Sequence, residues 1–387
     1  MAQLVDPPRV AVLIPCLLTG GTEVATLETA MALHALGFAV EVVVYFDEVD
    51  ATMLRAFESS GVRVRCLRLQ RGAGVFAHLR LAGVLAHALW RGPRPALVWL
   101  QYLTPTLLPL LVARPFARRL VATVHVAATH FGSRAQRRLR WLAAHWCDRV
   151  VCVSDMTATG LAGTDAAART RIAVIANAVD TDAARDAVPV PWRERAGWPE
   201  HAMVVGYVGR FATIKGPDLL LDAFALLASE HDKVRLVLVG AGAEDGALRA
   251  QASRLGIADR VHFAGPLPRE QVFPALRGFD LAVVPSREEG FGLSAAEAMA
   301  AGIATVATHV GALPEVLAQG RIGILVAPES PAALAQGMAA LLDDPVQRAM
   351  LATAGAADIA RRYGRDALRQ SLAALCDELG VNVEAGR

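Results

Sequence analysis

Two glutamates, Glu289 and Glu297, stand eight residues apart in the second half of the chain. Glu289 follows an apolar run, 281–285, that predicts a buried strand, and Glu297 lies in an alanine-rich stretch, 295–300, that favours a helix. Carboxylates accept hydrogen bonds from hydroxyl groups. At different depths of one site, the pair could bind a long ligand with many hydroxyls. On spacing alone, a solvated helix glutamate explains Glu297 equally well.

A glycine-containing turn separates these two carboxylates. Gly290 and Gly292 stand between the predicted strand and the predicted helix, and Ser294 can cap that helix. At a helix N-terminus, free backbone N–H groups and the positive end of the helix dipole favour an anion. The turn therefore predicts a diphosphate site, with a ligand-free turn of the common α/β type as the alternative.

Two cations follow another predicted strand, 203–208, in the same half of the chain. Arg210 and Lys215 come after it, and Pro217 is placed to start a helix. An arginine can bind phosphate bidentately, and two cations would neutralise a leaving diphosphate. A pair of solvated loop charges is the alternative, but Lys215 is one of only two lysines in the chain.

The first half of the chain offers a glycine loop and a histidine at a strand end. A strand over 9–14 leads into Gly20 and Gly21 and then a helix predicted over 24–36. This loop lets the backbone approach a phosphate, but it is not the G-x-G-x-x-G of dinucleotide sites. His125 ends a predicted strand, at the edge where open α/β sheets bind ligands. A turn without ligand and a structural histidine are the alternatives.

Strands and helices alternate along both halves, which predicts parallel, doubly wound sheets. In the first half, strands are expected near 9–14, 39–45, 62–66, 96–101, 120–124 and 149–153. The stretch 95–113 carries no charge. A break at Thr104-Pro105 nevertheless predicts a buried strand and helix there, and not a membrane span.

Length and composition fit two globular α/β domains of nearly equal size. The chain has 387 residues, 54% of them hydrophobic, with 32 glycines and 20 prolines. Its five cysteines are scattered without metal spacing, as expected in a reducing compartment, and each is expected to be a small buried hydrophobe. Asp6 and two prolines precede the first apolar run, so no signal peptide is predicted.

The net charge of +2 hides a strong asymmetry. Between Ser59 and Cys147 there is no Asp or Glu but there are fourteen arginines, so this stretch carries +14 and the remainder carries 2 − 14 = −12. Such a field attracts anionic surfaces, and no nucleic-acid-binding motif accompanies it. A solvated basic face without a partner is the alternative. The residues expected to meet an anionic bilayer are Arg63, Arg65, Arg68, Arg71, Arg134, Arg137, Arg138, Arg140, Trp141 and Trp146.

Several of these segments together resemble the retaining glycosyltransferases of family four, which have the GT-B fold. Glu289 to Leu293 and Glu297 to Gly302 are similar to the family's E-x7-E motif and its flanks. The run from Gly209 to Gly216 is similar to its Gly-Arg-(x4)-Lys-Gly. The loop at Gly20 resembles the Gly-Gly-x-Glu loop that opens the acceptor side in this family.

Shorter matches extend this resemblance to roughly residues 9 to 380. A Thr-x-His ends at His125, although Val126 stands where many members have Asp. The Val-Ser ending at Ser154 precedes a short helix, and Asn177 begins an Asn-x-Val-Asp turn in which Ala178 replaces the usual glycine.

The resemblance implies a role for each main site residue. Arg210 and Lys215 hold the donor phosphates, Glu289 contacts donor-sugar hydroxyls, Glu297 contacts the nucleotide ribose, and His125 reaches the donor sugar. Donor-binding residues are expected to include Gly20, Gly21, Gly209, Leu267, Phe291, Gly292, Leu293, Glu297 and Glu315. The leaving phosphate oxygen can take the acceptor proton on the same face, so no general base is required. With no metal-ligand cluster in the sequence, neither a metal nor a cofactor is expected beyond the nucleotide diphosphate sugar.

The predicted architecture is therefore α/β and GT-B, with two facing Rossmann-like domains, a deep cleft and a C-terminal crossover helix. The expected bounds are 1–184 with a helix at about 365–387, a linker at about 185–199, and a donor domain at 200–364. The expected activity is transfer of a hexose from a UDP- or GDP-sugar to a glycan or lipid-linked acceptor, by a cytoplasmic protein peripheral to the inner face of the cell membrane. A nucleotide-sugar epimerase or phosphorylase on the same fold, or an inactive nucleotide-sugar-binding subunit, are the alternatives.

Overall fold

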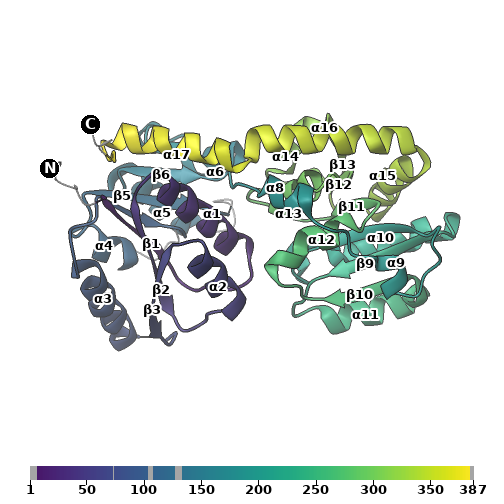
Figure 1. The fold of residues 1–387 in the computed structure, drawn as a ribbon, viewed down its shortest axis with the longest axis horizontal. Helices are drawn as coiled ribbons and strands as arrows, with labels where there is room; N and C mark the ends of the chain where they lie inside the picture. Colours follow the sequence, from purple (N-terminus) through teal and green to yellow (C-terminus); the bar gives the residue numbers. More distant parts are fainter. Residues whose placement is uncertain (1–6, 73, 103–107, 127–132, 384–387) are drawn as a thin grey trace. The chain divides into compact units, whose positions relative to one another are not determined.

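The computed structural model describes residues 7–72, 74–102, 108–126 and 133–383. Two units emerge from the pattern of contacts: residues 1–178 with 365–387, and residues 179–364. The predicted break at Thr104-Pro105 lies outside the described residues. The strand before it and the helix after it are both present (Figure 1).

The first unit is built on a seven-stranded parallel sheet with the order β3-β2-β1-β4-β5-β6-β7. Its strands are β1 (Arg9–Ile14), β2 (Ala39–Phe46), β3 (Arg63–Leu69), β4 (Leu97–Leu100), β5 (Arg119–Val124), β6 (Arg149–Cys152) and β7 (Ile172–Val174). Its helices are α1 (Gly21–Ala35), α2 (Ala51–Ser59), α3 (Val75–Trp90), α4 (Leu108–Ala113), α5 (Ser133–His145), α6 (Asp155–Ala162), α7 (Ala166–Arg169) and α17 (Arg365–Leu379).

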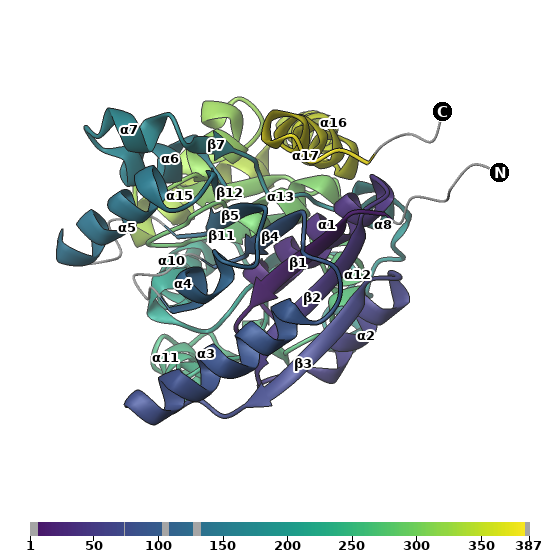
Figure 2. The same cartoon turned by 90° about the vertical axis from the view of Figure 1, so that its left-hand side faces the viewer.

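The helices of this unit cover both faces of its sheet. Figure 2 shows α3, α4 and α5 on one side of the sheet and α1 and α2 on the other. The strand order grows in opposite directions from β1, and right-handed crossovers then place the connecting helices on opposite faces. The central strands are buried on both faces and are therefore apolar, as in β4, Leu-Val-Trp-Leu, whereas the edge strand β3 carries three arginines and is mostly only partly buried.

Helix α17 belongs to the first unit although it ends the chain. Arg365 donates two hydrogen bonds to the Glu28 carboxylate on α1, at 2.6 and 2.8 Å. Arg119 donates to the Leu379 carbonyl at 2.7 Å, and Leu372 is buried. The predicted crossover helix that packs on the first domain is confirmed.

The second unit contains a six-stranded parallel sheet with the order β10-β9-β8-β11-β12-β13. Its strands are β8 (Met203–Val208), β9 (Val234–Val239), β10 (Val261–Gly265), β11 (Leu281–Val284), β12 (Thr305–Thr308) and β13 (Ile324–Val326). Its helices are α8 (Thr181–Asp186), α9 (Trp192–Arg195), α10 (Pro217–Glu230), α11 (Asp245–Arg254), α12 (Val272–Arg277), α13 (Leu293–Ala300), α14 (Leu313–Val316), α15 (Pro331–Asp343) and α16 (Pro345–Tyr363).

The segment expected to be a linker, 185–199, is a packed part of the second unit. The Val190 N–H donates to the Pro274 carbonyl at 2.8 Å. Trp192 is fully buried, stacks on Phe279 and donates its indole N–H to the Ala275 carbonyl at 2.9 Å. Prolines and charged residues surround these apolar side chains in the sequence. For that reason the composition of 185–199 indicated a linker. The second unit begins at Val179, before the predicted domain end at 184.

Candidate functional site

The site residues of the second unit meet at the carboxyl ends of two neighbouring strands. Arg210 and Lys215 follow β8, and Glu289 follows β11. Strands β8 and β11 pair in parallel, and the strand order reverses between them. Ligands of doubly wound sheets bind at such a switch point, because the loops after the two strands diverge there.

Lys215 and Glu289 form an ion pair. The Lys215 Nζ lies 2.6 Å from Glu289 Oε1, and Ser286 donates its hydroxyl to the same oxygen at 2.9 Å. The Glu289 side chain is 7% exposed and the Lys215 side chain 25% exposed. Glu289 Oε2 accepts no hydrogen bond from the residues that the structure describes, so it can accept one from a ligand hydroxyl.

Arg287 fixes the loop that carries Glu289. Its guanidinium binds both oxygens of Asp218 at 2.7 Å and donates to the Thr213 carbonyl at 2.6 Å. The backbone N–H of Arg287 donates to the Ile214 carbonyl at 2.9 Å. Hydrogen bonding to Asp218 raises the pKa of Arg287. The pKa of Asp218 is lowered: burial alone would raise it, but the hydrogen bonds and charge of Arg287 outweigh that effect.

Two glycines allow this loop to approach its neighbours closely. Gly216 has a φ of +66°, and a Cβ there would lie 2.1 Å from the Pro285 carbonyl oxygen. Gly311 has a φ of +54°, and a Cβ there would lie 1.9 Å from the carbonyl oxygen of Glu289. Only glycine fits either position, because both the space and the left-handed backbone exclude a side chain.

Glu297, on the buried side of α13, is paired with an arginine that the sequence motifs did not indicate. Arg269 forms an ion pair with Glu297 Oε1 and lies over the Phe273 ring, 5.2 Å from its centroid. The side chains of Glu297 and Arg269 are 7% and 18% exposed. Among the described residues, Glu297 Oε2 has no hydrogen-bond donor, which leaves one carboxylate oxygen for a ligand.

The start of α13 differs from the prediction that Ser294 caps it. The helix begins at Leu293, and Gly292 is its N-cap with a φ of 97°. Ser294 therefore lies inside the first turn, and the predicted serine cap is wrong. The left-handed Gly292 turns the chain directly into the helix. Phe291 is buried and packs edge-to-face on Tyr363, with ring centroids 5.1 Å apart.

The remaining predicted donor residues of this unit also lie on loops after strands. Gly209 and the exposed Arg210 follow β8, and no side chain that the structure describes forms an ion pair with Arg210. Leu267 follows β10 and is partly buried. Glu315 lies in α14, where its carbonyl accepts a hydrogen bond from Arg362 at 2.9 Å.

In the first unit, the predicted site residues follow β1 and β5. Gly20 is the N-cap of α1, which begins at Gly21, three residues earlier than expected. His125 follows β5 and is partly buried, and its Nε2 lies 3.4 Å from Oε1 of Gln101, the residue after β4. Burial lowers the pKa of His125 to about 4, so its imidazole is neutral at physiological pH.

Two family models cover most of the chain. The model described as Glycosyltransferase Family 4 matches residues 19–183, and the model described as Glycosyl transferases group 1 matches residues 191–358. A relative from Streptomyces avermitilis, named D-inositol 3-phosphate glycosyltransferase, is 32% identical over 346 residues, which is 81% of this chain and 74% of that one. The chain belongs to glycosyltransferase family 4.

Other similarities agree with this assignment. A D-inositol 3-phosphate glycosyltransferase of Mycolicibacterium smegmatis is 38% identical over 188 residues, covering 46% of this chain and 42% of the relative. The crystal structure of Anabaena HepE in complex with UDP and glucose matches with a TM-score of 0.81 and 23% identity, over 96% of this chain and 100% of that one. Sucrose-phosphate synthase from Thermosynechococcus elongatus matches with a TM-score of 0.77 and 22% identity, over 96% and 99%. These two structural matches confirm the predicted GT-B fold.

The arginines of this glycosyltransferase's first unit divide into structural and free groups. Arg65 pairs with Glu41, Arg71 pairs with Glu48, and Arg140 donates to the Leu161 carbonyl at 3.0 Å. Trp146, expected at a membrane, is partly buried and donates its indole N–H to the Leu110 carbonyl at 3.2 Å. The arginines exposed on α3 and α5 that form no ion pair with the described part of the chain are Arg80, Arg134 and Arg137.

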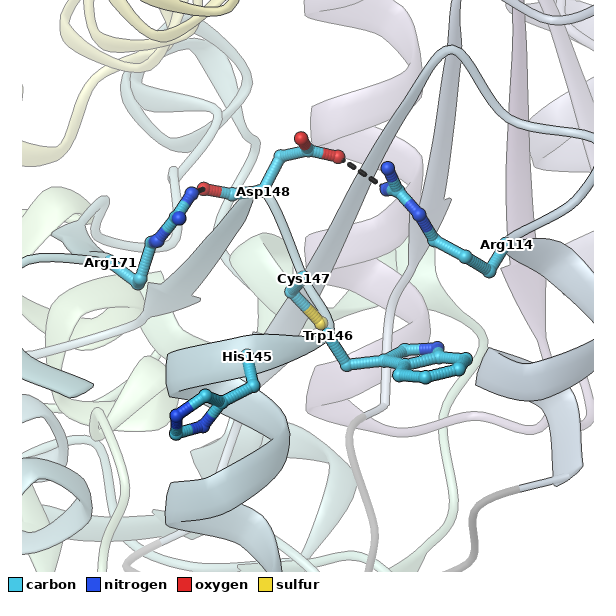
Figure 3. A pocket seen from close by; sticks show the side chains of 6 residues that line it. All are labelled: Arg114, His145, Trp146, Cys147, Asp148 and Arg171. Carbon is cyan, nitrogen blue, oxygen red and sulfur yellow. Dashed lines mark hydrogen bonds and ion pairs between the residues drawn. The ribbon is translucent and has the colours of Figure 1, made fainter. Parts of the chain in front are cut away.

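A cavity of about 290 Å³ lies at the opposite edge of the first sheet, away from the predicted site residues. It is lined by Arg114, His145, Trp146, Cys147, Asp148 and Arg171 (Figure 3). Arg114 pairs with the Asp148 carboxylate at 2.6 Å, and Asp148 also accepts from the Leu120 N–H at 2.8 Å. These bonds connect the starts of β5 and β6, so Arg114 and Asp148 in this cavity stabilise the sheet.

Proposed function

We propose that this chain is a retaining hexosyltransferase. It moves a hexose from a UDP- or GDP-sugar to a hydroxyl of a glycan or lipid-linked acceptor. Membership of the family and the 32% identity to the D-inositol 3-phosphate glycosyltransferase of Streptomyces avermitilis support glycosyl transfer. The structural similarity to HepE in complex with UDP and glucose favours UDP as the nucleotide of the donor.

The arrangement of Lys215 and Glu289 supports this function best. Glu289 keeps one free carboxylate oxygen for a sugar hydroxyl, while its other oxygen is held by Lys215 and Ser286. A lysine ammonium has three N–H donors, so Lys215 can hold Glu289 and a phosphate oxygen together. The exposed Arg210, on the same loop, supplies a second cation as charge grows on the leaving diphosphate.

The proposed reaction retains the anomeric configuration and uses no metal. The acceptor hydroxyl attacks the anomeric carbon on the face that the diphosphate leaves, and the leaving phosphate oxygen takes the hydroxyl proton. Arg210 and Lys215 supply the positive charge that a metal provides in other transferases. Within the described ranges, no three His, Cys, Asp or Glu side chains gather as metal ligands would.

We also propose that the acceptor is lipid-linked and that the first unit docks on the anionic inner face of the cell membrane. No helix in the described ranges is long and apolar enough to cross a bilayer. Docking would use the exposed side chains of α3, α4 and α5. Those that support it are Val75, Phe76, Leu79, Arg80, Trp90, Leu111, Arg134, Arg137 and Trp141.

These exposed side chains suit an anionic bilayer. Phe76 is 88% exposed, and the other apolar members are 44% to 71% exposed. Apolar side chains beside arginines can enter the interface of a membrane while the arginines meet lipid phosphates. A soluble inositol phosphate is a second candidate acceptor, because the Streptomyces avermitilis relative carries that name.

A donor and acceptor panel tests the proposal. Thermal shifts with UDP-, GDP- and ADP-sugars identify the donor, because a ligand that binds the folded state raises Tm. Turnover with that donor is then measured with lipid-linked, inositol phosphate and glycan acceptors, with and without EDTA, and the anomeric configuration of the product is read by NMR. Binding without transfer to any acceptor would contradict the proposed activity. An inverted product or loss of turnover in EDTA would contradict the mechanism.

A further inference from the structure

Gln101 occupies a distinctive position in the first unit. It follows β4 directly, and β4 lies between β1 and β5. Its backbone N–H donates to the Leu13 carbonyl of β1 at 3.0 Å, and its side-chain Oε1 lies 3.4 Å from His125 Nε2, after β5. The strand order reverses between β1 and β4, which makes this the switch point where doubly wound sheets bind ligands.

The amide nitrogen of Gln101 is buried without a hydrogen-bond acceptor. Gln101 is 1% exposed. Among the side chains that the structure describes, only two buried polar atoms lack a hydrogen-bond partner: Gln101 Nε2 and Glu41 Oε1. Glu41 Oε1 still lies 2.6 Å from the Arg65 guanidinium, so the amide of Gln101 is the less compensated of the two.

The buried amide N–H of Gln101 lacks a hydrogen-bond acceptor within the described ranges, which is energetically unfavourable and needs an explanation. Leaving a buried polar group unpaired destabilises the folded protein, which an apolar side chain of the same size would avoid. Two positions before Gln101 the same strand shows the usual solution, since the buried Trp99 donates its indole N–H to the Thr123 hydroxyl at 2.7 Å. A buried amide at a ligand-binding edge is therefore best explained by an acceptor that arrives with the substrate.

The contact with His125 has a consequence for the imidazole. A neutral imidazole carries one N–H, and its other nitrogen is an acceptor. With the amide oriented as in the structure, Gln101 Oε1 accepts a hydrogen bond and therefore selects the tautomer with the proton on Nε2. Nδ1 is then an acceptor, and no described residue donates to it.

We propose that Gln101 is a positioning residue that holds His125 in the Nε2–H tautomer, and that its own amide N–H binds a hydroxyl oxygen of the substrate sugar. Together the two side chains offer one donor, Gln101 Nε2, and one acceptor, His125 Nδ1. A sugar hydroxyl both donates and accepts, so this pair matches its chemistry. The inference rests on the proposed function for the identity of the ligand, whereas the pairing of the two residues does not depend on it.

Two variants and one control test the proposal in the full-length chain. Gln101→Met removes both the acceptor and the donor at nearly the same volume. Gln101→Glu keeps an acceptor for His125 but removes the donor. Gln70→Met is the matched control, because Gln70 also follows a strand, β3, and is exposed.

The first readout is the tautomer of His125, from side-chain ¹⁵N and ¹³C NMR of histidine-labelled protein with the signal assigned by His125→Gln. We expect Nε2–H in the wild type and in Gln101→Glu, and a mixture of tautomers in Gln101→Met. If His125 in Gln101→Met kept the single Nε2–H tautomer, the positioning role would be overturned. If Gln101→Met does not fold, Gln101→Glu supplies the test. A mixture of His125 tautomers in Gln101→Glu would also overturn the positioning role.

The second readout is kcat/KM for transfer. We expect a fall of about tenfold or more in both Gln101 variants, as for the loss of one substrate hydrogen bond, and no change in Gln70→Met. Turnover of Gln101→Glu at the rate of the control would overturn the substrate contact. If the wild-type protein transferred no sugar at all, the proposed function would be contradicted. The tautomer of His125 would still test whether Gln101 positions that side chain.

Discussion

Lys215 and Glu289 lie 74 positions apart in the sequence, yet Lys215 Nζ is 2.6 Å from Glu289 Oε1. The lysine follows β8 and the glutamate follows the neighbouring strand β11. Lys215, which is proposed to bind the phosphates, and Glu289, which is proposed to bind the sugar, therefore form one hydrogen-bonded ion pair. The ion pair aligns Glu289 before any ligand binds, and this lowers the cost of ordering the site when the donor arrives.

The first prediction concerns this pair. Lys215→Met should lower kcat by about a hundredfold or more, because transition-state charge loses a cation, and Arg210→Ala should act similarly. Lys215→Met should also destabilise the protein by about 3–5 kcal/mol, because it leaves Glu289 buried without its partner. Steady-state kinetics and urea unfolding measure the two effects. Lys233→Met, at the exposed second lysine, is the control and should change neither.

The double variant Lys215→Met/Glu289→Gln separates structure from catalysis. Removing the unpaired charge should recover most of the lost stability. Turnover should stay low, because both groups act on the donor. Recovery of turnover together with stability would show that Lys215 only neutralises Glu289, and the proposed phosphate role would then be wrong.

The second prediction divides the roles of the two glutamates. Glu297→Gln should weaken the binding of free nucleoside diphosphate, because Glu297 is proposed to hold the ribose. Glu289→Gln should leave free-nucleotide affinity nearly unchanged and lower sugar transfer. Isothermal titration with the identified nucleotide, followed by turnover, measures both. Equal loss of nucleotide affinity in the two variants would contradict this division.

Arg269 adds a test of that interpretation. If Arg269 orients Glu297 for the ribose, Arg269→Ala should weaken nucleotide binding, and the double variant with Glu297→Gln should bind no more weakly than Glu297→Gln alone. Additive losses in this double-mutant cycle would show that Arg269 and Glu297 contact the nucleotide independently.

The third prediction concerns the backbone behind Glu289. Gly311→Ala should destabilise the second unit by clearly more than Gly320→Ala, which is the control at a similar φ of +83°. A Cβ at 311 would lie 1.9 Å from a carbonyl oxygen, whereas one at 320 would lie 3.9 Å from a flexible leucine. The control should lose only the cost of a left-handed alanine, about 1–2 kcal/mol. Urea unfolding compares the two, and equal losses would mean that the loop relaxes freely.

The fourth prediction follows from the low pKa of His125. Burial places it at about 4, below the ordinary value, so between about pH 6.5 and pH 4 the unfolded chain binds a proton at this position that the folded chain does not. The free energy of unfolding should therefore fall through this window as the pH is lowered, and the contribution should be constant above it. Unfolding at pH 4.5 and pH 7.5 should show a larger acid loss in the wild type than in His125→Gln. The control His201→Gln removes an exposed histidine, and an acid loss in His125→Gln equal to the wild type would contradict the prediction.

The strand-and-helix pattern was sufficient to predict a parallel, doubly wound sheet in each half, because buried parallel strands are short apolar runs between turns. It did not predict the short strands β7, β12 and β13. It also brought Glu289 and Lys215 to one sheet edge, since the carboxyl ends of parallel strands meet there. It could not reveal Arg269 or Ser286, because their partners depend on loop conformations that no local pattern encodes. Gln101 was missed for a related reason: a single glutamine after a strand becomes notable only when its amide is seen to be buried and unpaired.

The charge asymmetry was visible in composition, but composition could not show which of the arginines are paired. Arg65 and Arg71 were expected at a membrane, yet they pair with acidic residues that precede the acid-free stretch. Counting charge along the sequence cannot show which arginines are neutralised across strands. The exposed apolar side chains of α3 are a separate signal. A helix that is apolar nearly all round should be buried, but α3 buries only one side and leaves Phe76 and Leu79 exposed on another.

The last prediction concerns the membrane and rests on that exposure. Phe76→Ser/Leu79→Ser should weaken cosedimentation with anionic vesicles by about tenfold or more, because two large apolar side chains no longer enter the interface. Arg134→Gln/Arg137→Gln should weaken binding at low salt by roughly 30-fold, from about 1 kcal/mol for each basic residue near the surface, and should also reduce the salt dependence. Val346→Ser/Met350→Ser is the matched control, because it removes two apolar side chains of comparable exposure from α16 of the second unit. Wild-type protein that stays in the supernatant with anionic vesicles at low salt would contradict membrane docking, and the soluble acceptor would then be favoured.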